Sequence, residues 1–320
     1  MDAPALAPQG HPLDTAPQGH PLDQAPQGHA WDQAAQGWNR HTHIIRAWLE
    51  EATAAMLSAA RIESGAKVLD IAAGAGDQTL DIARCVGPTG HVLATDISPT
   101  ILRLAAENAR AAGLHHVSTQ VADAESLGLS GSNFDAAVCR LGLMFCHAPL
   151  DALKQARAAL RPGGRFSALV FSQPQRNPCI GLMMRTALRH AGLAPRSPDL
   201  PGMLPGVLPS MLPGTMTGNL PGGLLSLGQP GLLTELMHSA GFIDVEIRTM
   251  AAPFRLPSSR HYVEFVRSSG TPIMQILAAL LPAAQAAAWD DMTQQLNEFS
   301  TPTGWVGPNE LLLCRASTAD

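Results

Sequence analysis

The sequence predicts an α/β fold: a doubly wound sheet of mainly parallel strands with helices on both faces. Strand-like and helix-like segments alternate strictly from Lys67 to Phe171. A loop of very small residues follows the first strand-like segment, within VLDIAAGAG (68–76). Apolar residues make up 46% of the 320 residues, which is ample for a buried core. Strict alternation implies parallel strands joined by right-handed crossovers.

The strand-like runs are rich in apolar and β-branched residues. They cover 67–73, 91–96, 117–122, 134–139, 165–171, 244–250 and 310–316. Among the helix-like runs between them, PTILRLAAENARAAG shows clear end signals. Ser98 is placed to cap this helix, Pro99 occupies its first position and Gly113 is placed to end it. Seven strands and their connecting helices therefore form the expected sheet.

Residues 1–37 contain a repeat, APQGHPLD, which begins at Ala7 and Ala16 and changes to APQGHAWD and AAQGW further on. Pro, Gly and Gln at this density bury too little apolar surface to offset chain entropy. We expect a disordered arm, and passive repeat expansion is favoured over a weak metal-binding role for its histidines. Order is expected from Trp38, where an amphipathic helix leads to the first strand.

Residues 38–320 are predicted to form one domain with two additions. An insert at 195–230 is rich in Leu, Met, Pro and Gly, and its prolines forbid a regular helix. It is either a passive loop or an apolar lid. Residues 253–305 are amphipathic in places and are expected to form a helical cap.

Composition excludes several classes of function. The net charge of −5 offers no basic surface for nucleic acid. The five cysteines are scattered without metal-ligand spacing, so we expect reduced thiols, no metal site and a cytoplasmic location. No apolar run is long enough for stable membrane insertion. A homodimer is left open.

The small-residue loop resembles a dinucleotide loop only in part. Gly74 and Gly76 fit the first two glycines of G-x-G-x-x-G, but Thr79 occupies the third position. Asp70 and Asp77 would also place negative charge beside a pyrophosphate. The loop therefore favours a ligand that carries an amine and no phosphate.

Carboxylates follow the next two strands. Asp96 ends the second strand, where a carboxylate can accept hydrogen bonds from both hydroxyls of a ribose. Asp123 and Ala124 follow the third strand, where an adenine amine would lie. Each signal is weak alone, but their order along the chain is specific.

The segments VLDIAAGAGDQT, ATDIS, VADAESL, FDAAVCRLGLMF and LRPGGRF together resemble the class I S-adenosylmethionine-dependent methyltransferases. The similarity is to the branch of ubiquinone and menaquinone C-methyltransferases and covers roughly residues 38–316. It implies a Rossmann-like sheet of order 3-2-1-4-5-7-6 with an antiparallel last strand, and S-adenosyl-L-methionine as cofactor.

The resemblance also implies the residues that bind the cofactor. By this resemblance, Asp70, Gly74 and Gly76 would bind the methionine moiety. Asp96 and Ile97 would bind the ribose and adenine, and Asp123 and Ala124 would bind the adenine. Arg140 and Leu141 would lie near the sulfonium. Ala72 stands where the family pattern has its first glycine.

Methyl transfer is an in-line displacement, so positioning is the main catalytic task. His147 is the first candidate for a base, if one is used, and the alternative is an exposed turn histidine. Other candidates are His41, His43, His261 and Tyr262, each with a structural alternative.

Two questions about the site stay open. Arg140 could bind a carboxylate of cofactor or substrate, or form a salt bridge to Asp123. We expect a small apolar acceptor, aromatic or quinone-like. The alternatives are a cofactor-binding module without catalysis and, because Cys139 and Cys146 flank the site, a thiol or arsenic S-methyltransferase.

Overall fold

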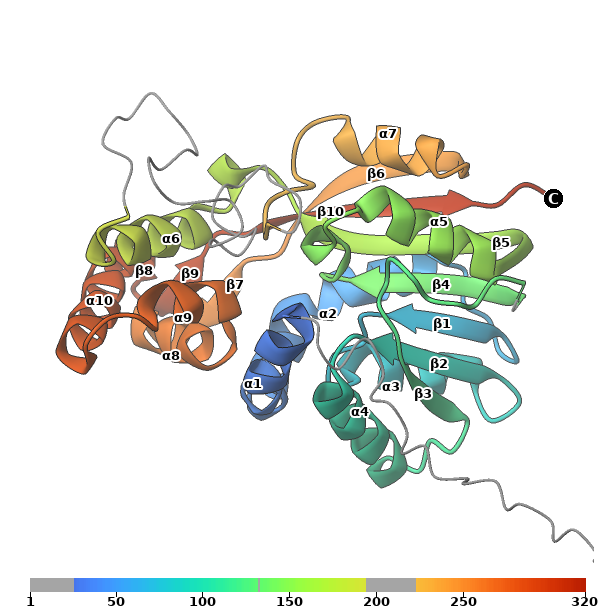
Figure 1. The fold of residues 1–320 in the computed structure, drawn as a ribbon, viewed down its shortest axis with the longest axis horizontal. Helices are drawn as coiled ribbons and strands as arrows, with labels where there is room; N and C mark the ends of the chain where they lie inside the picture. The colour runs from blue at the N-terminus through green and yellow to red at the C-terminus, as the bar shows by residue number, and fades with distance from the viewer. Residues whose placement is uncertain (1–25, 132, 194–222) are drawn as a thin grey trace, which may run out of the picture.

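The computed structural model describes residues 26–131, 133–193 and 223–320. A large sheet with its helices forms one end of the molecule, and a mainly helical cap forms the other (Figure 1). The strands of the large sheet are β1 (Lys67–Ile71), β2 (His91–Asp96), β3 (Val117–Val121), β4 (Phe134–Arg140), β5 (Leu160–Phe171), β6 (Ile243–Ala251) and β10 (Glu310–Ser317).

The strand order is β3-β2-β1-β4-β5-β10-β6, and β10 runs antiparallel to both of its neighbours. The predicted fold class and strand order are therefore confirmed. One face of the sheet is covered by helices α2 (Thr42–Ala59), α3 (Asp77–Val86) and α4 (Pro99–Ala111). Helices α5 (Pro149–Ala159) and α7 (Leu232–Ser239) cover the other face.

The ends of α4 show why the local sequence signals were reliable. The Ser98 hydroxyl accepts a hydrogen bond of 3.0 Å from the amide of Ile101. Gly113 has a φ of +72°, and Leu114 N donates to the Ala109 carbonyl at 2.9 Å, which closes the helix. Both ends are thus satisfied by residues within one turn of the helix.

The predicted disordered arm of residues 1–37 lies partly outside the described residues. Residues 26–37, however, belong to helix α1 (Pro26–Arg40), so the prediction is wrong for them. The repeat loses a helix-breaking proline where Ala30 replaces it and gains an aromatic anchor, Trp31. Trp38 Nε1 donates to the Ser269 carbonyl at 3.1 Å, so distant contacts hold α1 in place.

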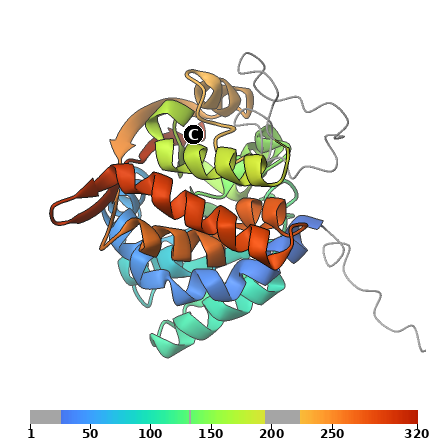
Figure 2. The ribbon, with the colours of Figure 1, turned by 90° about the vertical axis from the view of Figure 1, so that its left-hand side faces the viewer.

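The cap differs in one respect from the expected helical segment. Its helices are α6 (Pro178–His190), α8 (Ser259–Ser269), α9 (Thr271–Leu277) and α10 (Pro282–Leu296), and the cap faces the viewer in Figure 2. It also contains a small antiparallel sheet of β7 (Phe254–Leu256), β9 (Gly304–Gly307) and β8 (Ser300–Thr301). Trp305 on β9 is buried, and its ring stacks on Tyr262 at 5.0 Å.

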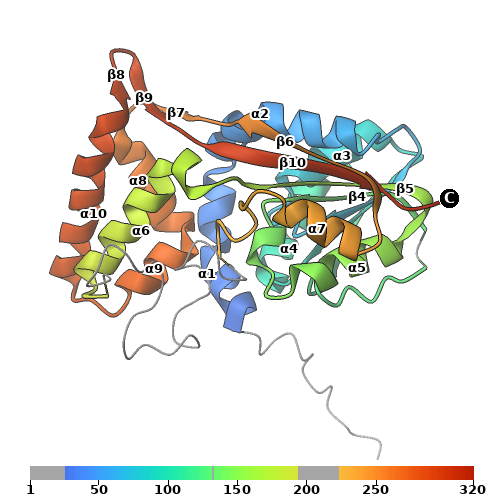
Figure 3. The same cartoon turned by 90° about the horizontal axis from the view of Figure 1, so that it is seen from above.

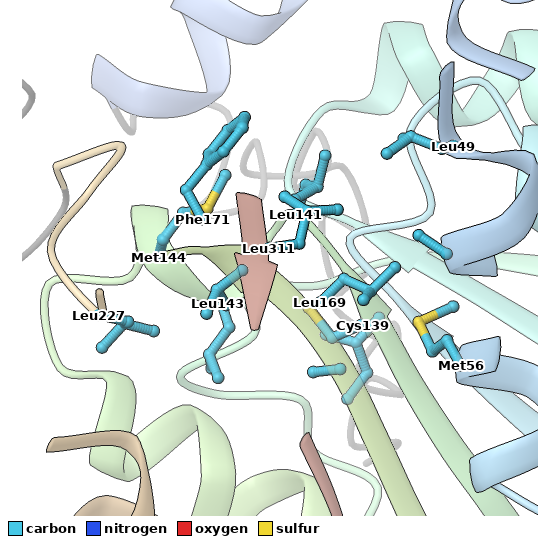
Figure 4. Packing of buried hydrophobic residues seen from close by; sticks show 14 of the residues in the cluster. Leu49, Met56, Cys139, Leu141, Leu143, Met144, Leu169, Phe171, Leu227 and Leu311 are labelled. Carbon is cyan, nitrogen blue, oxygen red and sulfur yellow. The ribbon is translucent and has the colours of Figure 1, made fainter. Parts of the chain in front are cut away.

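The core runs without a break from the large sheet into the cap. Apolar side chains from α2, β4, β5, β10 and the segment after β4 pack together in its middle (Figure 4). Figure 3 shows β10 running from the cap along the whole sheet. The two parts therefore share one buried interior, and α2 contributes Leu49 and Met56 to it.

Most of the predicted insert at 195–230 lies outside the described residues. Its last part, 223–230, packs on the sheet: Leu227 is 2% exposed, and Ser226 Oγ donates to the Met144 carbonyl at 2.9 Å. Among the helices of the described ranges, none combines the length and apolar character needed to cross a membrane.

Candidate functional site: a cavity at the ends of the parallel strands

A cavity opens at the carboxyl ends of β1, β2 and β4, beneath α1. This is where ligands bind in open parallel sheets. The predicted cofactor residues that line it are Ala72, Gly74, Asp96, Ile97, Asp123, Ala124, Arg140 and Leu141. Four separate segments of the chain thus meet at one place, as their order had suggested.

The loop after β1 turns sharply around the cavity. Ala72, Gly74 and Gly76 have φ values of +54°, +58° and +85°. Gly76 does not line the cavity; a Cβ there would come 2.9 Å from the Cβ of Ala105 on α4. Its role is close packing of α3 on α4, while Ala72 and Gly74 present the loop to a ligand.

Asp96 connects this loop to the end of β2. Its carboxylate accepts hydrogen bonds from the amides of Gly74 and Ser98, both at 3.0 Å. Burial raises the pKa of Asp96, and the amide hydrogen bonds oppose that shift. Asp96 lines the cavity, and a carboxylate with two oxygens can accept hydrogen bonds from a pair of hydroxyls.

Asp70 does not reach the cavity. It is fully buried, and its carboxylate accepts hydrogen bonds from Gln78 Nε2 at 3.0 Å and Thr79 Oγ1 at 2.6 Å. Burial raises its pKa to about 6 although both hydrogen bonds act in the opposite direction. Asp70 therefore anchors the first turn of α3, and Gln78 lines the cavity instead.

The raised pKa of Asp70 predicts a specific pH dependence of stability. The folded state favours the protonated acid, so this stabilisation is complete below about pH 4 and is lost as the pH rises through about 6. Asp70→Asn cannot ionise. We expect its stability relative to wild type to increase by about 3 kcal/mol between pH 4 and pH 7, measured by denaturant unfolding. Parallel curves for the two proteins would contradict this assignment.

Arg140 forms an ion pair, but its partner is not Asp123. Its Nη2 lies 2.7 Å from Asp77, and its Nη1 donates to Thr53 Oγ1 at 2.8 Å. Arg46 on α2 contacts the other oxygen of Asp77 at 2.8 Å. The predicted salt bridge to Asp123 is therefore wrong; an arginine-flanked carboxylate borders the cavity instead.

None of the candidate bases lines this cavity. His147 is exposed, and its backbone amide donates to Glu125 at 2.7 Å. His41 packs edge-on against Phe265 at 5.6 Å, and burial, then His43, lowers its pKa. His43, His261 and Tyr262 likewise lie away from the cavity.

The sequence interpretation missed an aromatic wall of the cavity, formed by Trp31, Trp38 and Phe145. The ring of Trp31 packs edge-on against Phe145 at 5.0 Å and lies 6.3 Å from Trp38. The signal was present: both tryptophans stand where the repeat departs from its first two copies.

The two cysteines near the site differ in their position. Cys146 borders the cavity, whereas Cys139 is 1% exposed in the core and does not. Burial raises the pKa of Cys139 to about 12 and the pKa of Cys146 well above its ordinary value. Neither side chain is set up as a thiolate.

Comparison with known proteins agrees with this geometry. Residues 68–164 match the family model described as a methyltransferase domain. This segment holds the loop after β1 together with Asp96, Asp123 and Arg140. The matched segment is therefore similar to a methyltransferase domain, and it is the part of the chain that forms most of the cavity.

The chain is also similar to the ubiquinone/menaquinone biosynthesis C-methyltransferase UbiE of Pseudomonas aeruginosa (strain LESB58). The two are 38% identical over 117 residues, which cover 36% of this chain and 46% of that protein. The chain thus matches less than half the length of this curated relative.

Solved structures share the fold at low sequence identity. The YcgJ protein from Bacillus subtilis has a TM-score of 0.54 and 16% identity, covering 85% of this chain and 99% of its own. The [4+2]-cyclase SpnF has a TM-score of 0.52 and 18% identity, covering 91% and 97%. These likenesses concern the fold alone.

Proposed function

We propose that this protein transfers a methyl group from S-adenosyl-L-methionine to a small apolar acceptor. One observation carries the proposal: the loop after β1, Asp96, Asp123 and Arg140 line a single cavity. The matched methyltransferase domain covers the same residues.

The cavity residues fit the parts of this cofactor. Asp96 offers two oxygens to a ribose, Ile97 and Ala124 offer apolar contact to an adenine, and Leu141 offers apolar contact near the sulfonium. The small loop residues allow close approach of the methionine chain. Asp77 and Arg140 present opposite charges to its zwitterionic end. When bound, the cofactor supplies the electrophilic methyl group.

The acceptor would lie against the aromatic wall. Trp31, Trp38 and Phe145 face the same cavity as Leu49 and Ile45. Flat aromatic rings pack well on such side chains, which favours an aromatic or quinone-like acceptor. The name of the relative UbiE, a ubiquinone/menaquinone C-methyltransferase, supports the same class. Holding the acceptor in line with the methyl carbon is the contribution of these residues.

Calorimetric titration with S-adenosylhomocysteine tests the cofactor half of this proposal. Incubation with methyl-labelled cofactor and extracts of small apolar metabolites tests the transfer half. We expect binding and one labelled product class. Absence of S-adenosylhomocysteine binding by the intact protein would overturn the proposal.

Trp31→Ala tests the assignment of the acceptor side. Loss of one aromatic contact should raise the acceptor KM about tenfold, while the affinity for S-adenosylhomocysteine stays within about threefold. Trp31→Phe keeps a ring and should largely restore the KM. An unchanged acceptor KM in the alanine variant would show that α1 does not contact the acceptor.

A binding protein without methyl transfer is the second candidate. The [4+2]-cyclase SpnF has the same fold and is named for a reaction other than methyl transfer, which favours this candidate. It predicts S-adenosylhomocysteine binding but no labelled product from any acceptor pool. A thiol or arsenic S-methyltransferase has little support, because only one of the two cysteines borders the cavity.

A further inference from the structure

Strand β6 is the last strand of the sheet, and its outer edge is open among the described residues. It has nine residues and pairs with β10 on one side (Figure 1). No hydrogen bond from the described ranges reaches the main chain of residues 245–250 from the other side. A long uncovered edge of this kind is a template for another strand.

One arginine on this strand forms no ion pair with any residue that the structure describes. Glu246 is bound by Arg315 of β10 at 2.5 Å, yet its side chain remains 50% exposed. Arg248 forms no ion pair within the described ranges, and it lines the same hollow as Arg61, Arg315 and Glu246. Arg248 therefore lies near two other arginines, and Glu246, the acid in the same hollow, is already bound by Arg315.

We propose that β6 pairs antiparallel with β6 of a second copy of this chain, centred on Ile247. In that register Glu246 of each copy lies directly opposite Arg248 of the other, on one face of the joined sheet. Arg315, Glu246 and the second copy's Arg248 then form a row of alternating charge. Val245 and Thr249 face each other on the opposite face, and two seven-stranded sheets become one.

The register is self-complementary, and this explains why a second copy is the occupant. A two-fold axis through Ile247 creates both Glu246–Arg248 pairs at once. Exposed charges on an edge strand often prevent pairing with other strands. Here Glu246 and Arg248 would disfavour pairing with most other strands. They are complementary to the same two residues of a second copy, so a second copy is the favoured partner.

Sedimentation velocity over a range of protein concentrations tests this interface. The wild type is expected to form a species of twice the monomer mass of 33.6 kDa. Arg248→Glu and Glu246→Arg each place like charges opposite one another, so each should weaken the dimer by on the order of tenfold or more. Thermal melting checks that both variants remain folded.

Mixing the two single variants tests the Glu246–Arg248 pairing most directly. In a mixed dimer, two arginines face two glutamates, so a one-to-one mixture should regain the dimer that neither variant forms alone. In the double variant E246R/R248E, the arginine at 246 of each copy faces the glutamate at 248 of the other, so this variant should also dimerise. Arg103→Glu, an exposed charge reversal on α4, should leave the dimer unchanged.

Three results would overturn the interface. These are a monomeric wild type at every concentration, single variants that dimerise like wild type, and a mixture that stays monomeric while both variants are folded. None of them bears on cofactor binding, so the interface and the proposed function fail independently.

Discussion

Asp96→Ala is expected to abolish measurable binding of S-adenosylhomocysteine. The substitution removes the carboxylate proposed to bind the ribose and the acceptor that holds the Gly74 amide at 3.0 Å. Loss of two charge-assisted hydrogen bonds costs about 3 kcal/mol or more, roughly a hundredfold or greater loss of affinity. Calorimetric titration measures the effect directly.

Two further variants separate a binding effect from a folding effect. Asp96→Asn keeps one acceptor oxygen and should retain part of the affinity. Asp151→Ala, at an exposed carboxylate on α5, should bind as wild type does. Undiminished binding by a folded Asp96→Ala protein would remove Asp96 from the cofactor site.

Arg140→Ala is expected to destabilise the fold by about 3 kcal/mol. The Arg140 side chain is 6% exposed, and its removal leaves the nearly buried Asp77 with one cation instead of two. Thr53 also loses its hydrogen-bond donor. Denaturant unfolding measures the loss, and weaker binding of S-adenosylhomocysteine should accompany it because Asp77 borders the cavity.

Arg161→Ala is the matched control for this experiment. Arg161 pairs with Asp135 at 2.6 Å, but half of its side chain is exposed. Water screens such a pair, so its loss should cost less than about 1 kcal/mol. Equal destabilisation by the two substitutions would contradict a special role for the buried pair.

The structure shows which parts of the candidate site were readable from the sequence. Asp96 and Asp123, which the sequence placed at the ends of two strands, line one cavity. Their place follows from the strand order, which the family resemblance implied. The direction of a side chain was harder to predict. Asp70 lies at the end of β1, next to the small-residue loop, but its side chain is buried beneath α3.

The parts that were missed depend on contacts between distant residues. Trp38 bonds to Ser269, which is 231 positions away, and Arg140 meets Asp77 across 63 positions. The small sheet of the cap joins Phe254 to Gly307. No local pattern encodes such partners, because each contact depends on how the helices and strands have already packed.

The sequence by itself therefore determined the doubly wound sheet, its strand order and the segments that form the cavity. The sheet and these segments depend on hydrophobic periodicity, helix caps and small residues, all of which act within a few residues of each other. The strand order was implied by the family resemblance. Only the tertiary structure decided that residues 26–40, which include the last part of the repeat, form a helix over the cavity, and that Arg140 pairs with Asp77. The physical reason is burial. A charge or an aromatic ring that is removed from water must interact with the groups that packing places next to it.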